Sequence, residues 1–239
     1  MKLCVINFSG NVGKTTIAAH LLKPRMNDPQ VFSVESFNSG IENEGVEDAE
    51  IIKGKRFADL ANEILIADEA IVDVGASNVE TFLMLMSQYA GSHEDYDYYI
   101  IPTVSQKKQL TDTISTIKTL SEMGIPAKKI KIVFNRVEYD EIDELDAFAS
   151  LIGFHSTNPI FTFNEKSVVL INDIFDGLKK VNKTLSDLVA DKTDFKAIIR
   201  DKKTTPKEKD FALNMLALQR LSIGANKNLD AAYQALFQD

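Results

Sequence analysis

One stretch decides the fold of this chain, and it reads Asn7-Phe8-Ser9-Gly10-Asn11-Val12-Gly13-Lys14-Thr15-Thr16. It comes directly after an apolar run and directly before a helical run at residues 17–22. A loop between a strand and a helix can direct backbone N–H groups and the helix N-terminus at a phosphate, and Gly10 and Gly13 allow conformations that a Cβ atom would block. The segment therefore predicts a binding loop for a nucleoside triphosphate.

Three side chains of this loop have expected partners. Lys14 is placed to reach the β- and γ-phosphates, Thr15 to offer a hydroxyl to Mg²⁺, and Thr16 to contact the α-phosphate. The general Walker A pattern requires glycine six residues before the lysine, where this chain has Phe8. The loop is therefore a variant of that pattern.

Length and charge limit the class of protein. The 239 residues fit one large α/β domain, or one domain with an appendage, since a typical domain has about 150 residues. The chain carries 27 basic and 35 acidic residues, a net charge of -8, which argues against a whole-surface affinity for nucleic acid and leaves room for a local basic patch. The apolar runs are shorter than the ~20 residues of a membrane span, and the first residues turn polar too soon for a signal peptide. We expect a cytoplasmic protein.

The single cysteine and the three histidines point to no redox or zinc chemistry. Cys4 lies in an apolar run, where a buried small side chain is expected. His20, His93 and His155 are scattered, with no nearby cysteine and no helical pairing, so the sequence gives no support to a zinc site.

Apolar runs alternate with helical patterns along the first two thirds of the chain. Strands are expected at residues 3–8, 31–35, 70–74, 98–102 and 130–135, and several are apolar almost throughout, as in strands covered on both faces. Residues at helical spacing lie between them: Phe57, Leu60 and Ile64, then Leu110, Ile114, Ile117 and Leu120. The pattern predicts a three-layer α/β fold with a mostly parallel sheet flanked by helices, and the loop at residues 7–16 makes it a fold of the P-loop NTPase type.

The pattern changes after Phe154. Asn158-Pro159 breaks the chain and mainly helices follow, so we predict a core at residues 1–175 and a helical C-terminal extension at 176–239. Thr204-Thr205-Pro206 is expected to end any helix, and a short acidic last helix is expected from an Asn228 cap to Phe237.

The polar stretch from Arg200 to Lys209 is locally basic. Five positive side chains oppose only Asp201 and Glu208, and they are Arg200, Lys202, Lys203, Lys207 and Lys209. A solvated linker between helices is the simpler interpretation, and a local contact with DNA is the functional one.

An acid stands at the end of the third expected strand. Asp73 lies within an apolar run and is followed by Gly75 and Ala76. An aspartate there can bind Mg²⁺ through water, and a flexible glycine loop can respond to the γ-phosphate and change shape on its loss.

The loop from Ser9 to Thr16 resembles the deviant Walker A motif of the ParA/MinD family. That motif usually reads Lys-Gly-Gly-Val-Gly-Lys-Thr-Thr, and six of its eight positions agree. Stretches at residues 5–14, 76–80, 91–95 and 101–104 also resemble the plasmid stability proteins called StbB. The resemblance spans about the first 140 residues and implies ATP and Mg²⁺ as cofactors.

The resemblance also assigns roles and departures. It implies that Glu35 takes the place of a first aspartate and holds a magnesium-bound water, that Asn135 contacts the adenine, and that Arg136 flanks the base. The signature lysine, which reaches across a nucleotide-sandwich dimer, falls on Ser9, and a second aspartate falls on Phe37. Both losses predict slow hydrolysis. Asn-Arg-x-Glu at 135–138 is also a distant echo of a guanine-reading motif, so GTP stays open.

The implied function is a ParA-like, nucleotide-dependent ATPase switch in plasmid stability, partition or intracellular positioning. Its expected partners are a second copy in a nucleotide-dependent homodimer and a plasmid-encoded DNA-binding protein, in the cytoplasm or on the nucleoid. One alternative is a nucleotide-binding adaptor with negligible hydrolysis. A small-molecule kinase or synthetase is the other, although the sequence shows no acceptor-binding residues for it.

Overall fold

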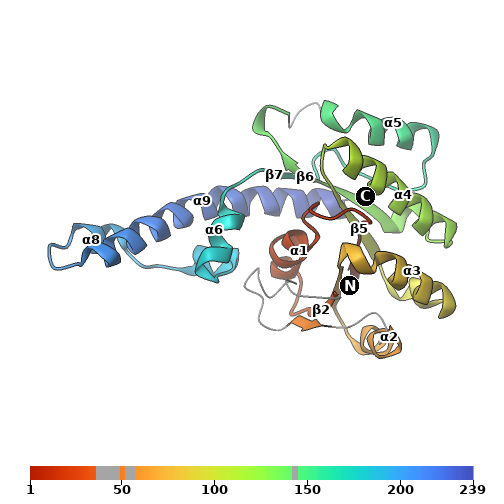
Figure 1. Cartoon of the computed structure of the whole chain (residues 1–239), viewed down its shortest axis with the longest axis horizontal. Coiled ribbons are helices and arrows are strands. Elements are labelled where there is room, and N and C mark those ends of the chain that lie inside the picture. Colours follow the sequence, from red (N-terminus) through yellow and green to blue (C-terminus); the bar gives the residue numbers. More distant parts are fainter. Residues whose placement is uncertain (36–48, 52–56, 142–144, 239) are drawn as a thin grey trace.

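The computed structural model describes residues 1–35, 49–51, 57–141 and 145–238, and its centre is a seven-stranded sheet (Figure 1). The strand order is β3-β2-β4-β1-β5-β6-β7, and every pairing between these strands is parallel. The strands are β1 (Lys2–Val5), β2 (Gln30–Val34), β3 (Ala49–Ile51), β4 (Ala70–Val74), β5 (Tyr98–Thr103), β6 (Ile130–Val137) and β7 (Val168–Leu170).

Helices connect the strands and cover both faces of the sheet. The first, α1 (Lys14–Thr16), continues as a π-helical turn, Ile17–Leu22, and a 3-10 turn, Lys23–Arg25. The others are α2 (Phe57–Ile66), α3 (Val79–Gln88), α4 (Lys107–Glu122), α5 (Ala149–Thr157), α6 (Ile174–Val181), α7 (Leu185–Ala190), α8 (Phe195–Arg200) and α9 (Pro206–Phe237).

Alternation along β1 divides the core into two layers. Cys4 and Ile6 join the apolar cluster under α2, α3, α4 and α5, whereas Leu3 and Val5 join the cluster under the π-helical turn and α9. Successive side chains of a strand point to opposite faces, so a strand covered on both sides is apolar throughout. The predicted three-layer α/β fold is confirmed, and Cys4 is buried as expected.

The five expected strands are all present, with ends that coincide with the prediction or differ from it by up to three residues. The sheet also has two strands that the pattern did not predict, β3 and β7, which form its two edges. Each has only three residues, too few for a period-2 or apolar-run signal to stand out.

The expectation of a short last helix beginning at Asn228 is wrong. A single helix, α9, runs for 32 residues from Pro206 to Phe237, which corresponds to about 48 Å at 1.5 Å per residue. Thr205 is its N-cap and forms a capping box with Glu208, and Pro206 takes the first turn, where its missing N–H costs nothing. The proline that was expected to end a helix begins one.

Asn228 instead joins α9 to the edge of the sheet. Its Oδ1 accepts a hydrogen bond from the backbone N–H of Leu170 at 3.0 Å, and its Nδ2 donates to the carbonyl of Val168 at 2.9 Å. Arg25, after the helix that follows the loop, also reaches α9, where its guanidinium pairs with Asp230 at 2.8 Å.

The two halves of α9 lie in different surroundings. Its C-terminal half packs on the sheet, and its N-terminal half projects from the body together with α8 (Figure 1). We call α8, the residues between it and α9, and the first turns of α9 the arm, residues 195–215.

None of the helices within the described ranges is long and apolar enough to cross a membrane.

Candidate functional site

The loop from Asn7 to Gly13 connects β1 to α1 at the carboxyl ends of the strands. Asn11 and Gly13 have positive φ angles, 60° and 86°, which turn the chain sharply before the helix. A Cβ atom on Gly13 would clash with the side-chain amide of Asn135, so only glycine fits there without a shift. The same amide donates to the carbonyl of Val12 at 2.8 Å. Asn135, expected near the nucleotide base, therefore contacts the loop itself.

Lys14 folds back over the loop. Its ammonium donates to the carbonyl of Ser9 at 2.7 Å and to that of Asn7 at 3.0 Å, and the residue is 7% exposed. Burial lowers the pKa of Lys14 to about 8, although the negative charges of Asp73 and Glu35 oppose the shift. A lysine whose charge is so poorly solvated gains strongly from phosphate oxygens.

Thr15 and Asp73 meet beside Lys14. The hydroxyl of Thr15 donates to Oδ2 of Asp73 at 2.7 Å. The parallel register of β1 and β4 sets Asp73 opposite Val5, and Asp73 is 2% exposed. A hydroxyl and a carboxylate oxygen in contact are the hard oxygen donors that Mg²⁺ prefers, so these two residues fit a magnesium site.

The residues expected to act as a switch lie next to the loop. The backbone N–H of Gly75 donates to the carbonyl of Val34 at 2.9 Å, and a Cβ on Gly75 would approach the Glu35 side chain to 3.1 Å. A Cβ on Gly10 would lie 4.0 Å from that of Ala76. Burial raises the pKa of Glu35, and the neighbouring Lys14 opposes the shift. Glu35, Gly75 and Ala76 thus surround the loop at the ends of β2 and β4.

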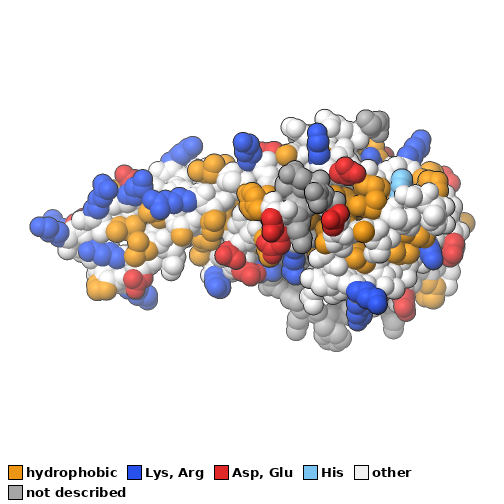
Figure 2. All heavy atoms as spheres, turned by 90° about the horizontal axis from the view of Figure 1, so that it is seen from above, with side chains coloured by type: hydrophobic (Ala, Val, Ile, Leu, Met, Phe, Trp, Pro, Cys, Tyr) orange, Lys and Arg blue, Asp and Glu red, His pale blue; other side chains and the backbone are white. Residues whose placement is uncertain are grey.

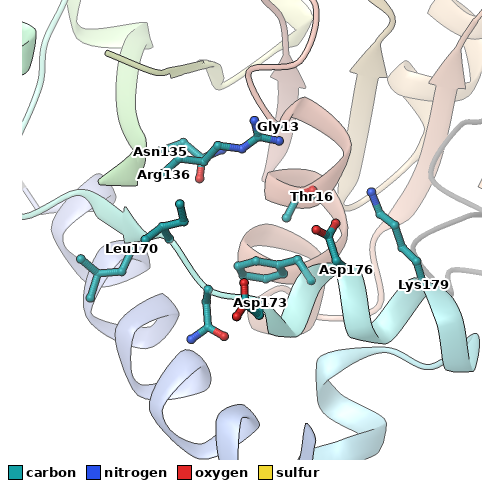
Figure 3. A pocket seen from close by; sticks show the side chains of 11 residues that line it. Gly13, Thr16, Asn135, Arg136, Leu170, Asp173, Asp176 and Lys179 are labelled. Carbon is teal, nitrogen blue, oxygen red and sulfur yellow. The ribbon is translucent and has the colours of Figure 1, made fainter. Parts of the chain in front are cut away.

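A pocket of about 300 Å³ opens on the other side of the loop (Figure 3). Asn135 and Arg136 line it, with Arg136 at a φ of 55°, and so do Asp176 and Lys179 of α6. The full lining is Gly13, Thr16, Asn135, Arg136, Leu170, Ile171, Asn172, Asp173, Phe175, Asp176 and Lys179. The structure therefore brings the two expected base-contacting residues to a cavity beside the phosphate loop.

Sequence reasoning missed the wall of this pocket from Leu170 to Lys179. The rule that ligands bind beyond the carboxyl ends of parallel strands would have found it, but β7 itself was not predicted. Asn7 was also missed as a functional candidate, because its hydrogen-bond partners lie about a hundred residues away along the chain.

Two expected features do not join the site. The basic stretch from Arg200 to Lys209 lies on the arm, away from α1 (Figure 1). Phe37, which takes the place of the second aspartate, lies outside the described residues. Ser9 is in the loop, buried, with its carbonyl bound to Lys14.

No protein-family model and no curated protein matches this sequence. Solved structures do match it. MinD of Aquifex aeolicus, at 11% identity, covers 93% of this chain and 96% of its own with a TM-score of 0.55. A ParA family ATPase of Chlorobium tepidum, at 15% identity, covers 89% and 98% with a TM-score of 0.54. A nucleotide-binding protein of Archaeoglobus fulgidus, solved with ADP, covers 76% and 86% at 13% identity and a TM-score of 0.50. The chain therefore has the α/β fold of the P-loop ATPases MinD and ParA.

Proposed function

We propose that this protein is a ParA-like ATPase that switches between conformations as it binds and hydrolyses ATP. The proposal rests on one observation: Lys14, Thr15 and Asp73 lie together at the end of the loop, where Gly13 adopts the left-handed conformation. A desolvated lysine, a hydroxyl and a carboxylate at a helix N-terminus together supply the groups that bind a nucleoside triphosphate.

The nucleotide would lie along the loop and enter the adjoining pocket. Backbone N–H groups from Gly10 to Thr16 would bind the phosphates, with Asn11 and Val12 at the turn. Asn135 and Arg136 would hold the base and Thr16 the α-phosphate. The Archaeoglobus protein of similar fold binds ADP, which supports an adenine nucleotide.

Thr15 and Asp73 would hold Mg²⁺. When bound, the ion would neutralise part of the triphosphate charge. The chain's own contribution is to orient these groups. The 2.7 Å hydrogen bond fixes the Thr15 hydroxyl against Asp73, and the Lys14 ammonium, now held by the carbonyls of Ser9 and Asn7, would turn its charge to the phosphates when they bind.

Hydrolysis would be slow. Ser9 takes the place of a lysine, and its neutral hydroxyl cannot balance developing negative charge in the transition state. The strand ends beside the loop would change shape when the γ-phosphate is lost, and the residues that would respond are Glu35, Gly75 and Ala76. An adaptor that binds ATP without turnover is the alternative, and the Ser9 substitution is the observation that favours it.

The finer role that we infer is in plasmid stability, partition or positioning, as the StbB-like stretches imply. We expect a nucleotide-dependent homodimer with a plasmid-encoded DNA-binding partner, in the cytoplasm or on the nucleoid. A MinD of the same fold has been solved in complex with MinC, which supports a partner protein.

The arm would contact DNA directly. Lys and Arg side chains gather along it (Figure 2), on a protein whose net charge is -8. The arm belongs to the helical extension that we place at residues 176–239, with the nucleotide-binding core at 1–175. The exposed basic residues of the arm are Lys196, Arg200, Lys202, Lys203 and Lys207, and Lys192 is exposed just before it.

Replacing Lys202 and Lys203 by glutamate tests this contact. Fluorescence anisotropy with duplex DNA should show weaker binding by the double variant, and wild-type affinity should fall steeply with salt because phosphate contacts release counterions. The matched control is Lys107→Glu with Lys108→Glu, another adjacent pair of exposed lysines, on α4. A flat salt response, or equal loss in both double variants, contradicts DNA binding by the arm.

The function itself is tested by calorimetric titration with ATP and with GTP in the presence of Mg²⁺, followed by turnover on the same sample. We expect tight ATP binding, slow turnover, and loss of binding in Lys14→Ala. Binding without turnover, with no stimulation by DNA, supports the adaptor. Equal, poor binding by wild type and Lys14→Ala overturns the proposal.

A further inference from the structure

A fully buried amide stands at the entrance to the phosphate loop. Oδ1 of Asn7 accepts the backbone N–H of Ser9 at 2.8 Å, and Nδ2 donates to the carbonyl of Pro102 at 2.9 Å. A backbone N–H only donates and a carbonyl only accepts, so these two partners fix the orientation of the amide. Nδ2 also donates to the hydroxyl of Thr113, on α4, at 2.8 Å.

Two threonines of α4 complete the network. Thr113 accepts from Asn7 and lies 3.1 Å from the hydroxyl of Thr103, so its own proton is available for that contact. One helical turn later, Thr116 accepts the backbone N–H of Phe8 at 3.0 Å and donates to the carbonyl of Asp112 at 2.8 Å. The Thr116 hydroxyl thus donates and accepts at once, the Thr113 hydroxyl has two polar partners, and both residues are fully buried.

The network fixes two consecutive N–H groups of the loop, those of Phe8 and Ser9. The carbonyls on either side of this segment, from Asn7 and Ser9, receive the Lys14 ammonium. The first half of the loop is therefore tied to β5, α4 and Lys14 by polar contacts, in addition to the packing of the Phe8 side chain on the core. Gly10 and Asn11 follow it and are exposed, so the anchored part ends where the proposed phosphate contacts begin.

We propose that Asn7, Thr113 and Thr116 are positioning residues: they hold the first half of the phosphate loop in its binding shape and tie that shape to α4. The inference rests on the proposed nucleotide site. A loop that adopts its competent shape only part of the time binds with an affinity reduced by that fraction, so anchoring raises affinity without touching the ligand.

The chemistry explains why asparagine is required at position 7. Aspartate would set a carboxylate oxygen against the carbonyl of Pro102, two acceptors facing each other in a buried site. Alanine would leave the N–H of Ser9 without its partner. At position 116, valine keeps the shape of threonine but removes the acceptor for the N–H of Phe8.

The test compares hydroxyl removal with hydroxyl retention. ATP titrations with Mg²⁺ are made on the full chain for wild type, Thr113→Val, Thr116→Val, Thr113→Ser and Thr116→Ser, with thermal unfolding of each. The matched control is Thr111→Val on the exposed side of α4, whose hydroxyl bonds only within the helix. We expect each valine to raise the Kd for ATP about tenfold, which is ~1.4 kcal/mol, and the serine variants and the control to stay within twofold of wild type.

A structural role alone would lower the melting temperature of the valine variants and leave their Kd unchanged, and that result overturns the proposal. Amide exchange of the nucleotide-free protein gives a second readout. The amides of Phe8 and Ser9 should exchange much more slowly than those of Gly10 and Asn11, and Thr116→Val should speed the exchange of the Phe8 amide. Fast exchange at Phe8 and Ser9 in the wild type also overturns it. A wild type that shows protected amides but no ATP binding instead contradicts the proposed function.

Discussion

The phosphate loop and α9 both contact the sheet, but the loop is irregular with buried polar side chains and α9 is a regular helix with an apolar stripe. The loop combines buried polar side chains, Asn7 and Lys14, with two left-handed residues, Asn11 and Gly13. The helix α9 is regular, and its buried positions recur at intervals of three and four as far as Ala235, with Leu236 next to it. They are Ala212, Met215, Leu218, Ser222, Ala225, Leu229, Ala232, Ala235 and Leu236.

The difference separates binding from stability. Burying a lysine and holding a non-glycine residue at positive φ both cost free energy, and the rest of the fold must supply it. The apolar stripe of α9 is one such source, because it closes one face of the sheet over Leu3 and Val5. Changes in α9 should therefore alter stability and spare affinity, whereas changes to the polar side chains at the loop should act mainly on affinity.

The largest effect is expected on the stripe. Leu229→Ala removes a side chain that is 1% exposed and shares a cluster with Leu3 and Val5, so the free energy of unfolding should fall by about 3 kcal/mol. The control on the same helix is Ile223→Ala, which is 70% exposed and should change stability by under ~0.5 kcal/mol. Urea denaturation measures both. A folded Leu229→Ala protein should keep the wild-type Kd for ATP, and a weakened Kd would break the comparison.

The same contrast explains which parts of the fold the sequence could predict. Five strands and the helical stripes of Phe57 and Leu110 carry their signal locally, as periodicity or an apolar run. The edge strands β3 and β7 were missed because three residues carry too little pattern. The start of α9 was misjudged because proline ends most helices, yet at the first position it is compatible with the helix.

For the site, ten consecutive residues were enough to predict a loop between the first strand and a helix, which the structure confirms, and to propose that it binds phosphate. Asp73 was also singled out, since a charge within an apolar strand is informative alone, and the structure sets it against Thr15; its part in binding Mg²⁺ stays a prediction. The network around Asn7 was not, because its partners Pro102, Thr113 and Thr116 are distant in sequence and only the fold brings them together. Polar side chains that act through tertiary contacts leave little local signal.

The next largest effect should be at Asp73. Asp73→Asn keeps an oxygen that can accept from Thr15 but loses the charge, so it should reduce the gain in ATP affinity on adding Mg²⁺ by about 30-fold, or ~2 kcal/mol. The control is Asp68→Asn, an exposed acid just before the other end of β4. Titrations with and without Mg²⁺ give the ratio. If adding Mg²⁺ raises ATP affinity by the same factor in Asp73→Asn as in wild type, Asp73 takes no part in binding the metal.

Two glycines allow the contact between the loop and Asn135 to be measured apart from the cost of a left-handed backbone. Gly13 and Gly91 have nearly the same φ, 86° and 92°, but a Cβ clashes with Asn135 only at Gly13. Alanine at either position brings the cost of a left-handed backbone, so the extra loss of stability in Gly13→Ala, about 1.5 kcal/mol, measures the clash and the broken Asn135 to Val12 hydrogen bond. Thermal unfolding compares the two. Equal losses would mean that Asn135 moves away freely.

The smallest effect, and the one that sets the two regions directly against each other, is the response to pH. Folding lowers the pKa of Lys14 from 10.5 to about 8. Between these values the unfolded chain binds the extra proton, so this residue makes stability rise with pH, while the deprotonated amine loses its attraction for phosphate. The Kd for ATP should therefore increase by up to tenfold per pH unit above pH 8, ~1.4 kcal/mol, and a Kd that stays constant over this range would contradict the prediction. Leu229→Ala should keep the full slope, because α9 supplies stability and takes no part in the titration.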